Sequence, residues 1–245
     1  MKKIIIFLLS IIYSFSQNTT DSNGLKQGNW ELYFPYSNNI LSEKGFFIDD
    51  KEEGLWLKYH EEGLIRELVN YKNGQMHGVR IVLDKKGKLV EQENYLNGQF
   101  DGIQMYFHDT SKIKMKVNYK NGLIEGELVK YYRNGKKQEM ATYINGLKNG
   151  LSIWYYDNEN ISIEYPYNNG LIEGVVKTYY NDGVLKSEAN YFNNEKEGES
   201  KIYYNSGNIK SLELYKKGQR NGKSYTYNED GTIQNVVKYK NGKVN

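Results

Sequence analysis

The three histidines, His60, His77 and His108, are the side chains of this chain best suited to acid–base or metal chemistry. His60 and His108 occupy the same position of two repeating units, so we expect their rings to lie about 20 Å apart. That distance is too large for one shared metal ion, and no cysteine or His-x-His spacing accompanies them. Other units carry tyrosine at this position, at Tyr132, Tyr156, Tyr180 and Tyr204. We therefore interpret both histidines as surface residues of the repeat and predict no metal site.

Acidic residues recur directly before a regularly spaced glycine, at Glu53, Asp101, Glu125, Glu173 and Glu197. Stacked along one edge of a sheet, these carboxylates would form a row able to hold calcium or a cationic partner. The intervening units carry His77, Asn149 and Asn221 instead, and the chain has no D-x-D-x-D-G loop. We interpret the row as a solvated polar edge.

Other catalytic arrangements are missing from the sequence. No glycine-rich phosphate loop leads from a strand into a helix, and no serine stands in a nucleophile elbow beside a histidine. Paired carboxylates for glycoside hydrolysis would need a cleft, which a regular sheet does not supply. We therefore expect a protein that is not an enzyme and that needs no cofactor.

Tyrosine pairs are the remaining candidates for binding. At Tyr131-Tyr132, and at the equivalent pairs in the next three units, one ring points to each face of a strand. If the first ring of each pair packs inward, the second rings form a row in contact with solvent. We predict a binding surface at Tyr132, Tyr156, Tyr180 and Tyr204, joined by Trp154. Tyrosine suits protein interfaces and stacking on sugars, but cross-strand tyrosine pairs also stabilise a sheet without binding anything.

These residues belong to a strict repeat of 24 residues. Tyrosine recurs at Tyr71, Tyr95, Tyr119, Tyr143, Tyr167, Tyr191, Tyr215 and Tyr239, and Phe47 fits the same spacing. The glycine that starts each unit stands at the same spacing at Gly54, Gly78, Gly102, Gly126, Gly150, Gly174, Gly198 and Gly222, and a first unit starts two residues out of phase at Gly28. An Asn-Gly pair such as Asn121-Gly122 predicts a type I′ turn, in which both central residues have positive φ. Units this short cannot bury a core alone and must stack on their neighbours.

Within each unit, polar and apolar residues alternate with a period of two, which predicts strands. Counting the unit's glycine as zero, positions 3, 5, 11 and 17 carry most of the apolar and aromatic residues, and we expect them to share one buried face. The sequence thus predicts an all-β fold for residues 17–245: an elongated, single-layer antiparallel β-meander, a solenoid of about nine hairpin repeats. Trp30 and Trp56 mark the first two repeats, which we expect to cap the solenoid.

The phrase Tyr71-Lys-Asn-Gly-Gln-Met-His-Gly78 resembles the MORN repeat, and residues 119–126, 143–150 and 167–174 match its tyrosine, asparagine and glycines. The period of 24, and the absence of a glycine two residues after Gly78 and Gly102, resemble the bacterial variant form. The resemblance covers nearly all of the chain after residue 16 and implies a β-hairpin solenoid. Many bacterial members are labelled as antitoxins of toxin–antitoxin systems, and eukaryotic MORN proteins are associated with membranes.

The first sixteen residues differ from the rest. Lys2 and Lys3 precede an apolar run from Ile4 to Tyr13, and small residues follow at Ser14 and Ser16. This is the pattern of a signal peptide over residues 1–16, so we expect export to the periplasm, the cell surface or the medium. There is no cysteine, and the remainder holds 31 basic and 30 acidic residues, a balance that argues against nucleic-acid binding.

Together these observations predict an exported, non-enzymatic scaffold that binds a protein through its tyrosine-rich face. An antitoxin or immunity protein that neutralises a toxic partner is the first alternative. A binder of an envelope glycan or a membrane surface is the second. The sequence leaves open the partner, the face used and the oligomeric state.

Overall fold

The computed structural model describes residues 17–245, which form one open antiparallel sheet with no helix. The proposed signal peptide, residues 1–16, lies outside the described residues. The first half of the sheet contains β1 (Thr19–Thr20), β2 (Lys26–Tyr33), β3 (Leu41–Ile48), β4 (Lys51–Tyr59), β5 (Ile65–Lys72), β6 (Gln75–Leu83), β7 (Leu89–Leu96), β8 (Gln99–Phe100), β9 (Gly102–Phe107), β10 (Ile113–Lys120), β11 (Leu123–Tyr131) and β12 (Lys137–Ile144). The second half contains β13 (Leu147–Lys148), β14 (Gly150–Tyr155), β15 (Ile161–Asn168), β16 (Leu171–Ile172), β17 (Gly174–Tyr179), β18 (Leu185–Phe192), β19 (Glu195–Tyr203), β20 (Ile209–Lys216), β21 (Gln219–Arg220), β22 (Gly222–Tyr227), β23 (Ile233–Lys240) and β24 (Lys243–Val244).

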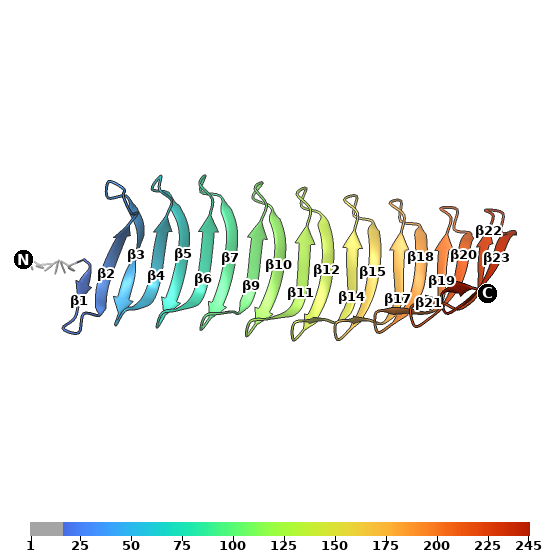
Figure 1. Ribbon diagram of the computed structural model, residues 1–245. Coiled ribbons are helices and arrows are strands. Elements are labelled where there is room, and N and C mark those ends of the chain that lie inside the picture. The colour runs from blue at the N-terminus through green and yellow to red at the C-terminus, as the bar shows by residue number, and fades with distance from the viewer. Residues whose placement is uncertain (1–16) are drawn as a thin grey trace, which may run out of the picture.

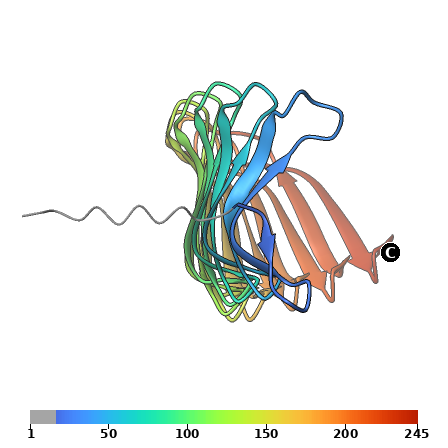
Figure 2. The same ribbon diagram turned by 90° about the vertical axis from the view of Figure 1, so that its left-hand side faces the viewer.

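Each long strand pairs with the next long strand, so the strands stand in sequence order from one end of the molecule to the other (Figure 1). The short strands β8, β13, β16 and β21 pair with the strand before them, which the following strand also pairs with. Seen along the long axis, the sheet is a single bent layer (Figure 2). The all-β class and the single-layer antiparallel meander predicted from the sequence are confirmed.

The turns explain why asparagine and glycine recur. At the lower ends of the hairpins in Figure 1, Asn121 and Gly122 have φ of 51° and 78°, as the predicted type I′ turn requires. At the opposite ends, the hairpin tips, Gly135 N–H donates to Tyr132 C=O and Gly135 itself has φ of 93°. This is a type I turn followed by a left-handed glycine, the usual form of a longer hairpin loop.

The glycine that starts each repeat lies where the strand pairing is irregular. Between β10 and β11 the register changes from Val117↔Leu128 to Tyr119↔Ile124, and Gly126 lies in the extra segment with φ of 83°. A side chain at this φ is strained even though nothing lies within 4 Å of the position that a Cβ would take. The regular glycine is therefore a requirement of the backbone at a β-bulge.

A second bulge, near each hairpin tip, overturns the predicted assignment of faces. The pairing passes from Lys130↔Glu139 to Tyr131↔Lys137, so one residue of the return strand is extra and the alternation changes phase. Positions 2, 4, 13, 15 and 17 therefore share one face, here called the packed face, and positions 1, 3, 5, 11, 14 and 16 share the other, the open face. The expectation that positions 3, 5, 11 and 17 share one buried face is wrong.

The deepest burial is on the packed face, at positions 2, 13 and 15. The residues concerned are Trp56, Glu67, Val69, Glu93, Gln104, Val117, Leu128, Glu139, Ala141, Ser152, Val176, Ala189 and Ser200. At its N-terminal end Phe47, Trp56 and Val69 form a cluster extended by Trp30, with ring centroids of Phe47 and Trp56 4.8 Å apart. The tryptophans of the first repeats thus supply the largest apolar contacts of the sheet.

The tyrosine that recurs every 24 residues also lies on the packed face. Burial raises the pKa of Tyr143 and Tyr167, and the Lys148 ammonium lies 5.1 Å from the Tyr167 ring centroid. Arg220 lies 5.2 Å from the Tyr239 ring in the same way. These cation–π contacts join neighbouring repeats along the sheet.

Candidate binding surface

The predicted tyrosine row lies along the hairpin tips, and its hydroxyl groups are used inside the sheet. The hydroxyl of Tyr132 donates to Tyr155 C=O at 2.6 Å, and that of Tyr156 donates to Tyr179 C=O at 2.8 Å. Tyr180 and Tyr204 make the same bond to the following repeat. All four rings are half-buried. The row therefore ties each hairpin tip to the next, and its role in binding stays a prediction.

The histidines at this position make the same contact with a carbonyl group of the next repeat. His60 Nε2 lies 3.3 Å from Leu83 C=O, and His108 Nε2 lies 3.0 Å from Tyr131 C=O. An imidazole N–H replaces a phenol O–H as the donor to the carbonyl of the next repeat. Their interpretation as ordinary repeat residues is supported by these contacts.

The row of acidic side chains also joins neighbouring repeats, at the hairpin ends that lie opposite the tips. Carboxylates of Glu53, Asp101, Glu125 and Glu197 accept a backbone N–H from the turn of the following hairpin, at 2.7 to 3.2 Å. Glu173 instead accepts from the amide of Asn168. His77, Asn149 and Asn221 also bond to the turn of the next hairpin. Within residues 17–245 no cluster of three His, Asp or Glu side chains is arranged to hold a metal ion.

Trp154 lies half-buried on the packed face of β14, whereas the tyrosine row that it was predicted to join lies along the hairpin tips. The Lys130 ammonium lies 5.9 Å from its ring centroid, and Lys130 also pairs with the buried Glu139 at 2.8 Å. Its binding role, like that of the tyrosine row, stays a prediction.

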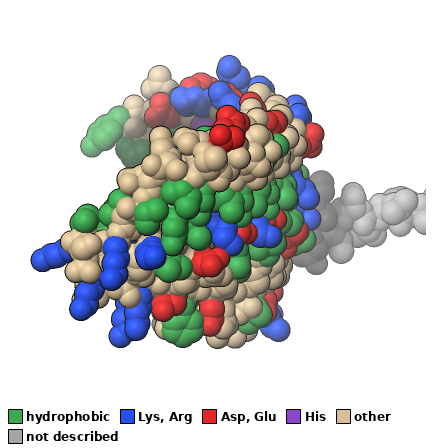
Figure 3. Space-filling view, turned by 90° about the vertical axis from the view of Figure 1, so that its right-hand side faces the viewer, with side chains coloured by type: hydrophobic (Ala, Val, Ile, Leu, Met, Phe, Trp, Pro, Cys, Tyr) green, Lys and Arg blue, Asp and Glu red, His purple; other side chains and the backbone are tan. Residues whose placement is uncertain are grey.

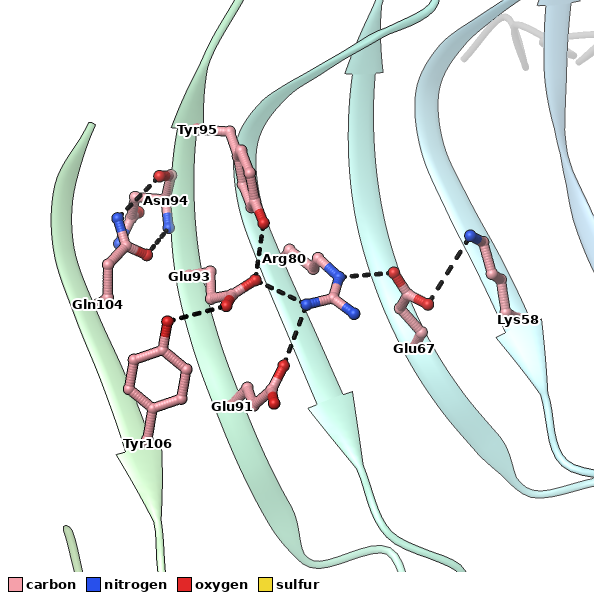
Figure 4. A network of polar contacts seen from close by, with 9 residues as sticks. All are labelled: Lys58, Glu67, Arg80, Glu91, Glu93, Asn94, Tyr95, Gln104 and Tyr106. Carbon is pink, nitrogen blue, oxygen red and sulfur yellow. Dashed lines mark hydrogen bonds and ion pairs between the residues drawn. The ribbon is translucent and has the colours of Figure 1, made fainter. Parts of the chain in front are cut away.

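The packed face carries an ion-pair network that the sequence analysis did not single out (Figure 4). The guanidinium of Arg80 contacts Glu67 at 2.7 Å, Glu93 at 2.6 Å and Glu91 at 3.1 Å. Lys58 lies 3.7 Å from Glu67. The network joins β4 to β7 across the face, and Arg80 is the one charged residue at position 2 of the nine repeats.

Two tyrosine hydroxyls complete the network by donating to Glu93, Tyr95 at 2.9 Å and Tyr106 at 3.1 Å. Burial, and then the bond to this carboxylate, raises the pKa of Tyr95 well above its usual value, and the pKa of Tyr106 is raised by burial and by the charge of Glu93. Both phenols therefore remain protonated donors at neutral pH. The arrangement is a closed set of partners, suited to holding the sheet together.

The open face offers an uncovered apolar surface. Position 1 of successive hairpins is aliphatic and 38 to 49 % exposed at Leu55, Val79, Ile103, Leu151 and Val175. Position 3 adds the half-buried Leu57, Ile81, Met105 and Ile153. Nothing within residues 17–245 covers these side chains, because the sheet is one layer thick (Figure 2).

Two further features border this surface. At the N-terminal end of the open face, a hollow of about 500 Å³ is lined by residues that include Lys44, Phe46, Leu55 and Leu57. At the C-terminal end, hydrophobic side chains form a band across the middle of the molecule with Lys and Arg side chains at its margin (Figure 3). On the open face itself the aliphatic row is interrupted by charged residues, at Glu127, Lys177, Glu199, Lys201 and Lys223.

Comparison with protein families supports the same architecture. The sequence model of the MORN repeat variant matches residues 52–73, 100–121, 124–145, 148–169, 172–193, 196–217 and 220–241. The chain belongs to the MORN repeat variant family. The stretch between the first two matches contains the MORN hairpin of β6 and β7, which carries Arg80 and two of its carboxylates. No curated protein matches this MORN chain.

Among solved structures, the chain is similar to one described as the crystal structure of GtfA/B complex bound to UDP and GlcNAc. The identity is 18 % and the TM-score 0.20, over 47 % of this chain and 22 % of that chain. A likeness this partial carries no argument about function.

Sequence reasoning missed the open face because the bulges reverse the alternation. The signal was present, since positions 1 and 3 are aliphatic in most repeats between Gly54 and Gly174. Strict alternation without a bulge assigns position 3 to the buried face. The structure leaves that apolar set uncovered.

Proposed function

We propose that this MORN repeat protein is an exported, non-enzymatic scaffold that binds another protein on the open face of its sheet. The observation that carries the proposal is the row of aliphatic side chains at position 1, which are 38 to 49 % exposed on a sheet that no other layer covers within residues 17–245. Contiguous exposed apolar surface of this kind is typical of protein–protein interaction sites. The conspicuous histidines, acidic residues and tip tyrosines are engaged between repeats, which leaves the open face as the best-supported contact surface.

Capture of a partner by the chain from Gln17 to Asn245 tests this function. The bait carrying Val79→Glu and Ile103→Glu should lose the partner, because a buried carboxylate without a counter-ion disfavours the complex. Glutamate at this position is compatible with the fold, since the chain has Glu127 and Glu199 there. A bait carrying Lys223→Glu, at the same position of the last hairpin and outside the aliphatic row, is the matched control.

The tyrosine row gives the competing prediction. A bait with Tyr132, Tyr156, Tyr180 and Tyr204 changed to serine, shown by circular dichroism to keep its sheet, should still capture the partner if the open face is the contact. The captured protein is then purified and titrated against each variant. Loss of binding only in the serine variant would assign binding to the hairpin tips and refute the open-face assignment.

An antitoxin or immunity protein would be one form of this activity, and the identity of the captured protein decides it. A glycan is the second candidate ligand, favoured by a hollow at the hairpin tips lined by Asn158, Tyr180, Asn181, Asp182 and Asn205. Amide, carboxylate and aromatic groups of this kind bind sugar hydroxyls and sugar faces. Titration with envelope oligosaccharides tests it, and a signal unchanged by Asn181→Ala and Asn205→Ala would exclude this hollow.

A further inference from the structure

A pocket of about 250 Å³, here called the packed-face pocket, lies over strands β17 to β20. It is on the side of the sheet opposite the proposed contact surface. Its floor is a row of small side chains that face one another across neighbouring strands and are 7 to 8 % exposed, Val176, Ala189 and Ser200. The same row carries the larger Trp56 and Arg80 nearer the N-terminal end of the sheet. Small side chains thus leave this part of the packed face unfilled.

Hydroxyl groups and tyrosine rings form the walls of the pocket. On the side of the hairpin tips, Thr178 Oγ1 and Ser187 Oγ lie 2.6 Å apart. The half-buried rings of Tyr165 and Tyr191 border it elsewhere. Serine and threonine hydroxyls both donate and accept hydrogen bonds, and a tyrosine ring offers an apolar surface to a sugar ring. The walls therefore suit a ligand that carries several hydroxyl groups on a ring.

One wall carries a cation with no counter-ion. Lys196 is directly opposite Tyr191 on the neighbouring strand. Its ammonium lies 3.5 Å from Ser200 Oγ and 4.8 Å from the ring centroid of Tyr215. It forms no ion pair within residues 17–245. Because Lys196 is half-buried, its charge is directed into the pocket with little competition from solvent.

Two other repeats contain an equivalent cation, and in both of them a carboxylate neutralises it. Lys148 and Arg220, like Lys196, each stand opposite one of the tyrosines that recur every 24 residues, and each lies 5.1 to 5.2 Å from the ring of the next one. Lys148 pairs with Glu139 at 3.1 Å, and Arg220 pairs with Glu213 at 2.9 Å. A cation at this position is thus normally held by a glutamate of the preceding strand.

Beside Lys196 that glutamate is missing. The residues of β18 equivalent to Glu139 and Glu213 are Ser187 and Ala189, and both line the pocket. The other charged side chains that line it are Glu213, which is already paired, and Lys186, which forms no ion pair within the described part of the chain. The pocket therefore combines empty space and positive charge at the place where the equivalent repeats hold a carboxylate.

We infer that the packed-face pocket binds a sugar acid, whose carboxylate contacts Lys196 in place of the missing glutamate. A carboxylate is favoured over a phosphate because a carboxylate is the group that occupies this place beside Lys148 and Arg220. The pocket is smaller than the range of about 300–1,000 Å³ usual for larger ligands, so we expect it to hold one sugar ring, free or within a glycan. The site is separate from the open face and does not depend on the proposed function.

The test is a ligand-observed NMR titration of the chain from Gln17 to Asn245 with D-galacturonate and D-glucuronate, each compared with its neutral methyl ester. At least one acid should bind about tenfold more tightly than its ester, and higher salt should reduce this difference. Lys196→Gln should weaken binding of the acid about tenfold or more, whereas Lys223→Gln, on the open face, should leave it unchanged. Tighter binding of trigalacturonate than of galacturonate would identify a glycan, rather than a free sugar, as the source of the acid.

A second variant fills the pocket. Ser187→Glu copies the arrangement of Glu139 and Lys148, so it should abolish binding of the acid without lowering the urea midpoint. Equal binding of acid and ester, no binding of either acid, or an affinity unchanged by Lys196→Gln or by Ser187→Glu would overturn the inference. Displacement of the acid by a lower concentration of inorganic phosphate would do the same, by assigning the pocket to phosphate. The variant carrying Val79→Glu and Ile103→Glu should bind the acid like the wild type, so failure here and failure of the open-face proposal are distinguishable.

Discussion

The Arg80 network makes the packed face sensitive to a single substitution, Arg80→Met. Within residues 17–245, Arg80 is the only cation in contact with Glu93, whose side chain is 5 % exposed, whereas Glu67 keeps Lys58 at 3.7 Å. Removing one partner of a buried ion pair costs about 3–5 kcal/mol. We expect the lower end, about 3 kcal/mol, because Arg80 and Glu91 are themselves 21 and 32 % exposed.

A matched double variant isolates the unpaired charge. Arg80 and Glu93 are directly opposite each other, as are Leu128 and Ala141 at the equivalent position two hairpins later. Arg80→Leu with Glu93→Ala copies that apolar pair and should recover most of the lost stability, because an apolar pair commonly replaces a buried ion pair without loss.

Urea unfolding followed by circular dichroism measures both variants. The single variant should lower the free energy of unfolding by about 3 kcal/mol and the melting temperature by about 6–12 °C, while the double variant stays close to the wild type. If the single variant is as stable as the double variant, the network does not stabilise the fold and the reasoning is refuted.

Three further outcomes follow from other contacts. Tyr156→Phe removes the 2.8 Å bond to Tyr179 C=O and should cost about 1 kcal/mol in urea unfolding; an unchanged midpoint would show that water replaces the hydroxyl. Gly45→Ala places a Cβ against the Trp56 ring and should cost about 1–3 kcal/mol, with a shift of tryptophan fluorescence; an unperturbed spectrum and midpoint would contradict the packing. Burial, and then a bond to a glutamate, raises the pKa of Tyr179 and Tyr203 from 10.0 to about 12, so their contribution to stability is complete below pH 10 and is lost as the pH rises to about 12. Urea midpoints should fall across that range, and less steeply after Tyr179→Phe; a flat profile would contradict the assignment.

The meander and its turns could be predicted because single residues encode them locally. Asn121-Gly122 requires positive φ at both positions whatever surrounds it, and the 24-residue spacing of such pairs sets the hairpin length. The equivalence of His60 and His108 with the tip tyrosines followed from their shared repeat position. The partner of those side chains, a carbonyl of the next repeat, depends on how hairpins stack and could not be read from spacing.

The faces could not be assigned, because a bulge is invisible to a count of alternating residues. The return strand has one extra residue opposite Lys130 and Tyr131. As a result Tyr143, the tyrosine that recurs every 24 residues, lies on one face of the sheet and Tyr131 lies on the other. A one-residue slip exchanges the two faces of a strand, so the apolar set expected inside lies on the open face. The Arg80 network escaped prediction for a related reason, since its charges come together only once positions 2, 13 and 15 share a face.

Cysteine labelling of paired positions tests the central claim, that the apolar open face is accessible and is the contact surface. The chain has no cysteine, so single variants report one site each. Ile103→Cys replaces a side chain that is 42 % exposed on the open face, and Val117→Cys replaces one that is 1 % exposed on the packed face of the adjacent strand. A water-soluble thiol reagent should modify Cys at 103 rapidly and at 117 only on unfolding, and the captured partner should protect 103. Rapid reaction at 117, or no protection at 103 under saturating partner, would contradict the account.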